Sequence, residues 1–347
     1  MSEATASKIP VTVLTGYLGA GKTTLLNRIL SENHGKKYAV IVNEFGEIGI
    51  DNDLIIGADE EVFEMNNGCI CCTVRGDLVR ILDGLMKRKG KFDAIIVETT
   101  GLADPAPVAQ TFFVDEDVQK NARLDAVVTV ADAKWLSDRL KDAPEAKNQI
   151  AFADVIVLNK TDLVTKPELA EVEARIRGIN PYAKLHRTER CSVALADVLD
   201  RGAFDLDRIL DIEPDFLEVD DHDHDHDHHH NHGHDHDHGH GLKHYHDEDM
   251  QSLSLKTDKP LDPNVFMPWL QNLVQVEGGK ILRSKGILAF HDDDDRYVFQ
   301  GVHMMLEGNH QRKWKDDEPR ESRLVFIGRE LPEELIRTGF ESCIVSR

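Results

Sequence analysis

The chain has 347 residues, enough for about two domains, and 41% of them are hydrophobic, enough for a sizeable core. Against 63 acidic residues there are only 41 basic ones, which gives a formal net charge of −22. Such an acidic chain would repel the phosphates of a nucleic acid, so we expect no nucleic-acid partner.

Other features of the composition give no sign of a membrane span or of a secretory signal. No apolar run approaches 18 residues, so we expect no membrane span, and residues 1–8 do not resemble a secretory signal. Three of the five cysteines fall within residues 69–72, which is unlike a disulfide framework. In a reducing compartment such a cluster indicates metal or redox chemistry, so we expect a cytoplasmic protein.

The first motif follows the first apolar run of the chain. A β-branched stretch ends at Gly16, and the spacing G-x-x-x-x-G-K-T leads from it into a helical pattern. This spacing predicts a phosphate-binding loop (P-loop), in which glycines let backbone N–H groups surround the phosphates at a helix N-terminus. Lys22 would supply a charge for the β- and γ-phosphates, and Thr23 a hydroxyl for Mg²⁺. The predicted nucleotide-binding residues here are Gly16, Gly19, Ala20, Gly21, Lys22, Thr23 and Thr24.

Two short apolar strands are predicted at residues 38–43 and 62–65, and an acidic loop lies between them at 43–51. In a nucleotide switch protein such a loop senses the γ-phosphate, and Glu44 is its candidate residue. A plain acidic surface loop remains an equal interpretation.

A cluster of thiols follows, formed by Cys69, Cys71 and Cys72. An apolar helical face over residues 74–86 places the cluster at a helix N-terminus, with Thr73 as the expected N-cap, a position that favours thiolates. Three thiolates suit Zn²⁺ and leave a fourth tetrahedral position open. The alternatives are inert buried cysteines or a redox dithiol, although C-x-C-C is not the C-x-x-C redox spacing.

The apolar strand predicted at residues 92–97 runs into Glu98. A carboxylate at the end of such a strand can hold Mg²⁺ directly or through water. Gly101 lets the backbone approach the γ-phosphate. The predicted catalytic residues are therefore Lys22, Glu98 and Gly101.

Strands are also predicted at residues 124–130 and 154–158, and the second ends in N-K-T-D. The Asp162 carboxylate can pair with the N1–H and 2-amino groups of guanine, which adenine lacks, and the stem of Lys160 can lie over the ring. Asn159, Lys160 and Asp162 are therefore predicted to bind GTP rather than ATP. A helix at 166–178 and a last strand at 184–191 follow, and Cys191 and Cys343 are expected to be ordinary packing residues.

Strands and helices alternate through the first 195 residues, which predicts an α/β fold with a doubly wound parallel sheet: a P-loop NTPase domain at residues 1–210. Residues 211–249 differ sharply, because eleven of the 19 residues at 222–240 are His and most of the others are Asp. We expect a mobile linker that binds transition metals with low specificity. An inert linker or a purification tag would be the alternatives.

Residues 250–347 are predicted to form a smaller α+β C-terminal domain with one sheet. Helices are expected at 264–276 and 332–339, and strands at 252–256, 281–290, 297–305 and 322–327. The acidic run 292–295 is expected to be a hairpin tip, and His291, His303 and His310 to be surface residues rather than metal ligands. No catalytic constellation is evident, so we expect a docking surface for a client protein.

Together these motifs resemble the CobW family of P-loop GTPases, which are zinc- and cobalt-handling metallochaperones. The resemblance covers nearly the whole chain and rests on residues 16–24, 43–46, 68–72, 98–101 and 159–162. It implies Mg²⁺-dependent GTP binding, slow GTP hydrolysis, and Zn²⁺ or Co²⁺ held at the three clustered thiols. It also implies transfer of the metal to a client metalloprotein, coupled to the nucleotide state.

Other functions remain open at this stage. The chain could be a passive zinc or cobalt buffer that stores ions in the His/Asp tract, or a cobalt-handling GTPase of cobalamin biosynthesis. A regulatory GTPase with a structural zinc is a further alternative. Thiolates bind both zinc and cobalt, so the sequence does not choose between the two metals.

Overall fold

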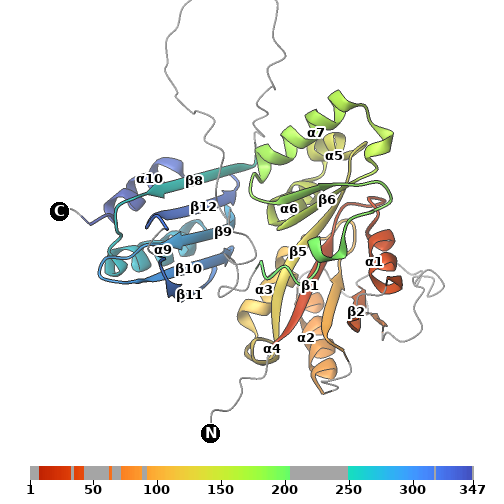
Figure 1. Cartoon of the computed structure of the whole chain (residues 1–347), viewed down its shortest axis with the longest axis horizontal. Coiled ribbons are helices and arrows are strands. Elements are labelled where there is room, and N and C mark those ends of the chain that lie inside the picture. The colour runs from red at the N-terminus through yellow and green to blue at the C-terminus, as the bar shows by residue number, and fades with distance from the viewer. Residues whose placement is uncertain are drawn as a thin grey trace, which may run out of the picture.

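The computed structural model describes residues 8–32, 35–42, 62–64, 72–87, 92–203, 249–315 and 318–345. Three of the predicted site residues, Glu44, Cys69 and Cys71, lie outside the described residues, as does the tract at 211–248. The described residues form two β-sheets with their own helices, which stand side by side (Figure 1).

The amino-terminal sheet is parallel throughout. In the described residues it has seven strands, in the order β3-β2-β4-β1-β5-β6-β7. The strands are β1 (Ile9–Thr15), β2 (Tyr38–Val42), β3 (Val62–Glu64), β4 (Ala94–Glu98), β5 (Ala122–Asp132), β6 (Val155–Asn159) and β7 (Lys184–Arg187). Among the described residues, helices connect β1 to β2 and each strand from β3 to β6 to the next strand in the chain, so the predicted doubly wound α/β fold is confirmed.

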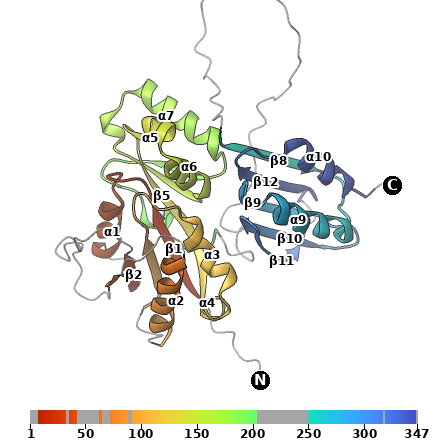
Figure 2. The same cartoon turned by 180° about the vertical axis from the view of Figure 1, so that it is seen from behind.

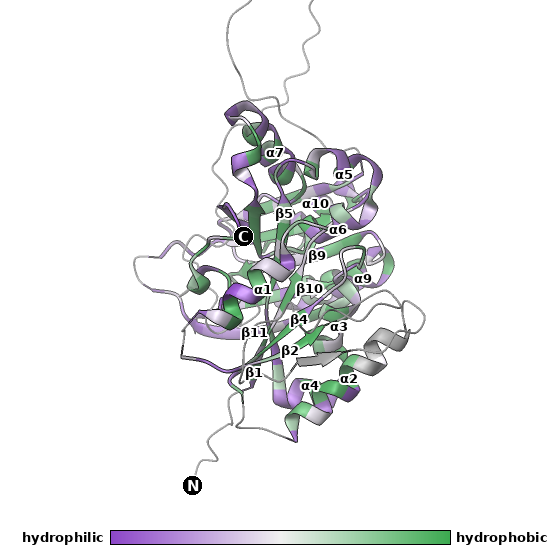
Figure 3. Ribbon diagram, turned by 90° about the vertical axis from the view of Figure 1, so that its right-hand side faces the viewer, coloured by the Kyte–Doolittle hydropathy of each residue, from purple (hydrophilic) through white to green (hydrophobic). Residues whose placement is uncertain are grey.

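The helices cover this sheet and bury most residues of its central strands. They are α1 (Lys22–Ser31), α2 (Cys72–Met86), α3 (Ala106–Val114), α4 (Glu116–Asn121), α5 (Leu136–Asp142), α6 (Pro144–Phe152) and α7 (Lys166–Ile179). Every residue of β2, β4 and β6 is buried, as expected for parallel strands with both faces covered. In Figure 3 the strands are mostly hydrophobic, whereas α5 and α7 turn hydrophilic residues outward.

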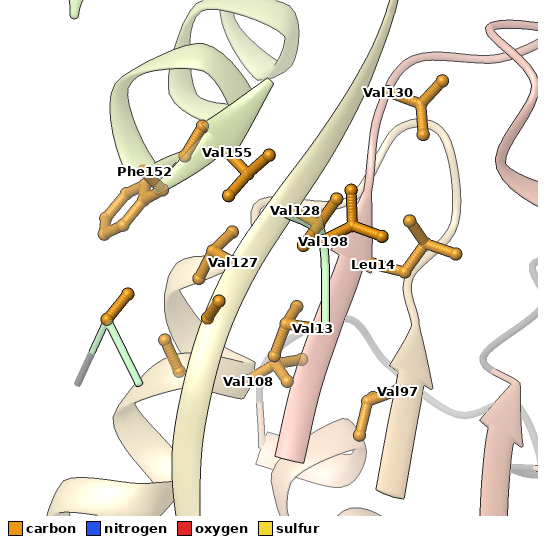
Figure 4. Close-up of a cluster of buried hydrophobic side chains, with 14 of the residues drawn as sticks. Val13, Leu14, Val97, Val108, Val127, Val128, Val130, Phe152, Val155 and Val198 are labelled. Atoms are coloured by element: carbon orange, nitrogen blue, oxygen red, sulfur yellow. The ribbon is translucent and has the colours of Figure 1, made fainter. Parts of the chain in front are cut away.

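The core is centred on β1 and β5, where valines of neighbouring strands meet side chains of α3 and α6 (Figure 4). The labelled residues are at most 3% exposed: Val13, Leu14, Val97, Val108, Val127, Val128, Val130, Phe152, Val155 and Val198. Both helices are therefore anchored on the strands that lead into the predicted nucleotide site.

The carboxyl-terminal sheet is antiparallel. Its described strands follow the order β11-β10-β9-β12-β8. The strands are β8 (Gln251–Thr257), β9 (Ile281–Leu288), β10 (Asp295–Val302), β11 (Met305–Lys313) and β12 (Ser322–Gly328), and the helices are α9 (Pro263–Glu277) and α10 (Glu333–Ser342). Phe266 of α9 and Phe340 of α10 belong to one hydrophobic cluster with the sheet, which confirms the predicted small α+β unit.

Apolar side chains of the same sheet also join the core of the amino-terminal part: Leu282, Ile287, Val298, Val302, Val325 and Ile327. In that interface α3 packs against β10 and β11, and α6 packs against β9 (Figure 2). A buried ion cluster lies beside it, because Arg283 and Lys285 of β9 both bond to the Asp154 carboxylate, which is 3% exposed. The two sheets are thus joined by an apolar and ionic interface.

Several predicted elements were wrong in detail. The strand predicted at 297–305 ends at Val302, and after a turn at His303 the chain returns as β11. Most of β11 is polar and solvent-exposed, so it carries no apolar alternation that would have predicted it. The strand predicted at 184–191 ends at Arg187. Helices α4, α5 and α6 were not predicted, and α6 is buried on so many sides that it shows no one-sided apolar pattern.

Candidate functional site

The P-loop connects the end of β1 to α1. Gly16, Gly19 and Gly21 all have positive φ angles, of 140°, 74° and 119°. A Cβ atom on Gly16 would lie 2.1 Å from the carbonyl oxygen of Val130 on β5. The loop therefore requires glycine both for its backbone conformation and for its close approach to the neighbouring strand.

Lys22 opens α1 and is buried. Its Nζ donates a hydrogen bond to the carbonyl oxygen of Gly16 at 2.7 Å, so the ammonium lies over the P-loop backbone. Burial lowers the pKa of Lys22 below its ordinary value, and the nearby Glu98 carboxylate partly offsets this shift. The predicted phosphate-binding lysine and the acidic end of β4 therefore lie close together. Thr23 and Thr24 follow at the exposed start of the helix.

Glu98 ends β4 next to β1, in register with Leu14, and is 7% exposed. The next residue, Thr99, donates its backbone N–H to Leu14 and its hydroxyl to Thr15, at 2.9 and 2.8 Å. These bonds fix the start of the segment between β4 and α3, residues 99–105, here called the β4–α3 loop.

The β4–α3 loop touches the P-loop at Gly101. A Cβ atom on Gly101 would lie 2.6 Å from the backbone nitrogen of Leu18. The carbonyl oxygens of Gly101 and Ala103 each accept a hydrogen bond from Gln149 of α6 at 3.1 Å. Gly101 is therefore held against the P-loop with the help of Gln149, a residue that sequence analysis did not single out.

Asn159 ends β6 and ties the N-K-x-D segment to the P-loop. Its side chain is buried, and Nδ2 donates to the carbonyl oxygen of Ala20 at 2.9 Å. Its Oδ1 accepts from the backbone N–H of Cys191 at 2.8 Å and from the hydroxyl of Thr188 at 3.3 Å. Asn159 thus has a structural role in orienting the segments around the predicted guanine site.

Lys160 adopts a left-handed conformation with φ 62°. Its Nζ donates to the carbonyl oxygen of Gly19 at 2.8 Å and to the carboxylate of Asp132 at 2.6 Å, which places its stem across the P-loop. Asp162 lies in the exposed 3-10 turn Thr161–Leu163 and is free to meet a base from solvent. The structure therefore brings all three predicted segments to one edge of the sheet.

Cys191 is buried, as expected, but it is more than a packing residue. Its thiol donates to the carbonyl oxygen of Gly21 at 3.4 Å, and a Cβ atom on Gly21 would lie 3.1 Å from Sγ. Burial raises the pKa of Cys191 to about 11, and the positive charge of Arg28 only partly opposes the shift. The thiol is therefore neutral at physiological pH. Nothing in the local sequence pattern links it to the P-loop.

The thiol cluster can be placed only by its flanking elements. β3 ends at Glu64 beside Val42, and Val42 pairs on its other side with Glu98, so the chain leaves β3 at the edge that carries the P-loop. α2 begins at Cys72, so the prediction that Thr73 is its N-cap was wrong: Thr73 lies inside the first turn. The backbone of Cys72 thus lies at the positive end of this helix.

Histidines of the C-terminal sheet form no metal site with the described residues. His310 pairs with Asp293 at 3.0 Å and His291 with Asp292 at 2.9 Å, and His303 meets the carbonyl oxygen of Gly278. Among the residues that the structure describes, no three His, Cys, Asp or Glu side chains are grouped as metal ligands.

A cavity of about 300 Å³ opens beside the P-loop, on the flank of α5 and α6. Its lining includes Leu18, Trp135 and Gln149, and the guanidinium of Arg139 lies 5.3 Å from the ring centre of Tyr17. Leu18 and Trp135 are 60% and 51% exposed. The P-loop therefore has an accessible apolar flank at this cavity.

The oxygen donors near the P-loop fit Mg²⁺. The Thr23 hydroxyl is exposed at the start of α1, and the buried Glu98 carboxylate lies near Lys22. The hydroxyl of Thr100 is buried and has no hydrogen-bond partner within the described residues. Hard oxygen donors beside a phosphate loop are what Mg²⁺ takes in nucleotide sites, since it combines one or two protein oxygens with phosphate oxygens and water.

This arrangement defines a P-loop nucleotide-binding protein with an N-K-x-D segment bonded to its P-loop. The chain belongs to the CobW family. The family model described as CobW/HypB/UreG, nucleotide-binding domain, matches residues 10–187, and the one described as cobalamin synthesis protein cobW C-terminal domain matches residues 250–344.

Two characterised relatives and one solved structure agree with this assignment. The chain is 34% identical to the zinc chaperone YjiA of Escherichia coli strain K12 over 337 residues, covering 96% of this chain and 98% of the relative. It is 35% identical to zinc-regulated GTPase metalloprotein activator 1 of Schizosaccharomyces pombe over 328 residues, covering 88% and 78%. The crystal structure of Zn(II)-bound YjiA GTPase from E. coli matches with a TM-score of 0.74 at 30% identity, covering 98% of this chain and 100% of that one.

No helix in the described part of the chain combines the length and the apolar character that a membrane crossing needs.

Proposed function

We propose that this protein is a GTP-hydrolysing zinc chaperone, which transfers zinc to a client metalloprotein in step with its nucleotide state. The observation that carries the proposal is the meeting of three segments at one sheet edge: the P-loop, the end of β4 with Gly101, and the segment Asn159–Asp162. β3, the last described strand before the thiol motif at 69–72, ends at this same edge. The relatives that are named zinc chaperone and GTPase metalloprotein activator support it.

In this proposal the nucleotide is held by residues with separate tasks. The P-loop amides and Lys22 bind the phosphates, Gly101 presents its backbone N–H to the γ-phosphate, and Asp162 reads the guanine. Thr23 and Glu98 would hold Mg²⁺, which neutralises charge on the phosphates when it is bound. Lys160, fixed by Gly19 and Asp132, would cover one face of the base.

Zinc is the cargo in this proposal, and its ligands are the thiols of Cys69, Cys71 and Cys72. A helix N-terminus lowers thiol pKa, and thiolate is the form that binds metal. Three protein thiolates leave one position of a tetrahedral site open to a fourth ligand, which permits exchange. The zinc-bound YjiA structure and the relatives named zinc chaperones favour zinc over cobalt.

The switch in the proposal is the loop system around the γ-phosphate. GTP would order the β4–α3 loop and the loop that contains Glu44. This ordering would draw the thiols into a tight metal site, and GTP hydrolysis would loosen that site.

We further propose the domain limits 1–210, 211–249 and 250–347, with the last as the client-docking unit. Free thiols at 69–72 would require a reducing compartment such as the cytoplasm.

The guanine-reading role of Asp162 is tested by exchanging Asp162→Asn. The carboxylate accepts hydrogen bonds from the 2-amino group of guanine, whereas an Asn amide can donate to the 2-oxo group of xanthine. We expect GTP affinity to fall about 10- to 100-fold and XTP affinity to rise, measured by titration of both nucleotides. Asp117→Asn, an exposed carboxylate on α4, is the matched control. Unchanged preference for GTP over XTP would contradict this role.

The two ligand sites are separated by a pair of variants. We expect Cys71→Ser to remove tight zinc binding while GTP binding stays close to that of the unmodified protein, because the P-loop does not use this thiol. Lys22→Ala should do the reverse. Equilibrium titration of zinc and GTP on both variants measures this, and tight zinc binding that survives in Cys71→Ser would refute the assignment of the thiols.

A further inference from the structure

Two neighbouring side chains of α6 lie between the nucleotide site and the C-terminal sheet. Gln149 is 1% exposed, and its backbone carbonyl accepts a hydrogen bond from Thr129 of β5 at 2.7 Å. The helix is packed on the other side against β9. Gln149 is therefore held in a fixed position, and Asn148 is its neighbour on the same helix.

On the nucleotide side, both amides hold the β4–α3 loop. Gln149 Nε2 donates to the carbonyl oxygens of Gly101 and Ala103, and Asn148 Nδ2 donates to the carboxylate of Asp104 at 2.8 Å. The other oxygen of Asp104 accepts the backbone N–H of Ala106, the first residue of α3. The segment that would contact the γ-phosphate is thus bonded to α6 at three of its seven residues.

On the other side, Asn148 is bonded to the C-terminal domain. Its Oδ1 accepts a hydrogen bond from the guanidinium of Arg329 at 2.7 Å, directly after β12. A planar amide has one donor group and one acceptor, and here the donor serves Asp104 while the acceptor serves Arg329. A rotation of this amide would therefore disturb both bonds together.

The surrounding interface makes this connection stiff. α3, which follows the β4–α3 loop, packs against β10 and β11. Both helices that hold the loop, α3 and α6, therefore contact the C-terminal sheet. Apolar side chains of the sheet are part of the same buried core as the strands β1 and β5. A displacement of the loop therefore cannot be absorbed by loose contacts, because packed interiors transmit strain.

We propose that Asn148 and Gln149 are positioning residues for the β4–α3 loop and that Asn148, through Arg329, couples the nucleotide-dependent state of this loop to the C-terminal domain. This inference rests on the proposed GTP-dependent function. It gives the C-terminal domain a means to distinguish the GTP state from the GDP state. By reciprocity, a change at Arg329 must alter how well the protein distinguishes the two nucleotides.

A double-mutant cycle on the full chain tests the coupling. The measured quantity is the ratio of the dissociation constants for GDP and a non-hydrolysable GTP analogue. We expect Arg329→Ala to change this ratio on the order of 2- to 30-fold, although Arg329 lies outside the predicted nucleotide site. In the Asn148→Ala background the same substitution should have no further effect, because the connecting amide is already missing.

The matched control is Ser254→Ala. It removes another interdomain contact, the side-chain hydrogen bond between Ser254 of β8 and Tyr182, which involves neither α6 nor Arg329, so the ratio should not change. An unchanged ratio in Arg329→Ala, or an equal change with and without Asn148, would overturn the coupling. If the unmodified protein binds neither nucleotide, the proposed function itself fails, which is a separate result.

Discussion

At the scale of single residues, the site depends on close contacts that leave no room for a larger side chain. Gly16 lies against a carbonyl oxygen of β5, and Gly101 lies against the backbone of Leu18. Both ends of the Asn159 side-chain amide form hydrogen bonds: Nδ2 bonds to the P-loop, and Oδ1 bonds to Thr188 and to the segment after β7. These motif residues therefore hold the segments of the pocket together, in addition to the ligand-binding roles predicted for them.

Gly16→Ala tests this directly. The added methyl would overlap the carbonyl oxygen of Val130, and φ 140° is strained for alanine, so we expect a stability loss of about 1–3 kcal/mol and a GTP affinity at least about tenfold lower. Gly84→Ala in α2 is the control, because its Cβ meets open space and should stabilise the helix by about 0.5–1 kcal/mol. Equal GTP affinity in both variants would contradict the geometric requirement.

The thiols of Cys191 and Cys343 should react slowly with alkylating reagents. With a pKa of about 11, Cys191 is thiolate in only about one molecule in a thousand at pH 8, and that fraction rises about tenfold per pH unit up to the pKa. Burial also raises the pKa of Cys343. Alkylation of the native, zinc-free protein at pH 8 should therefore label Cys69, Cys71 and Cys72 first. Fast labelling of Cys191 below pH 9 would show that its environment differs from the one described.

At the scale of elements, the site is assembled where parallel strands end. The P-loop, Glu98 and Asn159 stand at the carboxyl ends of β1, β4 and β6. These ends share one edge of the sheet because the paired strands are all parallel. α6 then supports this edge from the side through Gln149. Elements outside this arrangement, such as α7, contribute stability without touching the predicted site.

α7 provides a test of that separation. Thr165 and Glu168 form a capping box at its start, with the Thr165 hydroxyl and backbone N–H both bonded to the Glu168 carboxylate. Thr165→Ala should lower the free energy of unfolding by about 1 kcal/mol, measured by urea denaturation. GTP affinity should stay unchanged, and a large loss of affinity would show that α7 belongs to the site.

The same elements show what the sequence could and could not predict. Apolar strand patterns and the spacing of glycine, lysine and aspartate residues predict the parallel sheet and the P-loop, because both depend on local sequence. The contact of Gln149 with Gly101 depends on how α6 packs, and any amide on a buried helix would look the same in the sequence. Cys191 and β11 were missed for related reasons, since tertiary contacts and an exposed sheet edge leave no periodic signal.

At the scale of the whole molecule, the two sheets form one body across a mixed interface. Asp154 lies at its centre, where its carboxylate accepts the backbone N–H of Val127 and bonds to both Arg283 and Lys285. Burial lowers the pKa of Arg283, while the Asp154 charge opposes this shift. The two cations on β9 thus share one carboxylate of the nucleotide-binding part.

Asp154→Asn should therefore weaken the junction strongly. Removing one partner of a buried ion cluster leaves uncompensated charge, and we expect the free energy of unfolding to fall by about 3–5 kcal/mol in urea denaturation. Replacing Asp154, Arg283 and Lys285 together with apolar residues of similar volume should recover most of this loss. A loss of less than about 1 kcal/mol in Asp154→Asn would contradict the importance assigned to the cluster.

The most direct test of nucleotide-dependent zinc binding is the zinc dissociation constant, measured with two different nucleotides in the P-loop site. Competition with a chromophoric chelator would measure it first with a non-hydrolysable GTP analogue and then with GDP. Zinc should bind about 5- to 150-fold more tightly with the GTP analogue, and Cys71→Ser should abolish the difference. Equal zinc affinity in the two nucleotide states would contradict the proposal that GTP hydrolysis loosens the held ion.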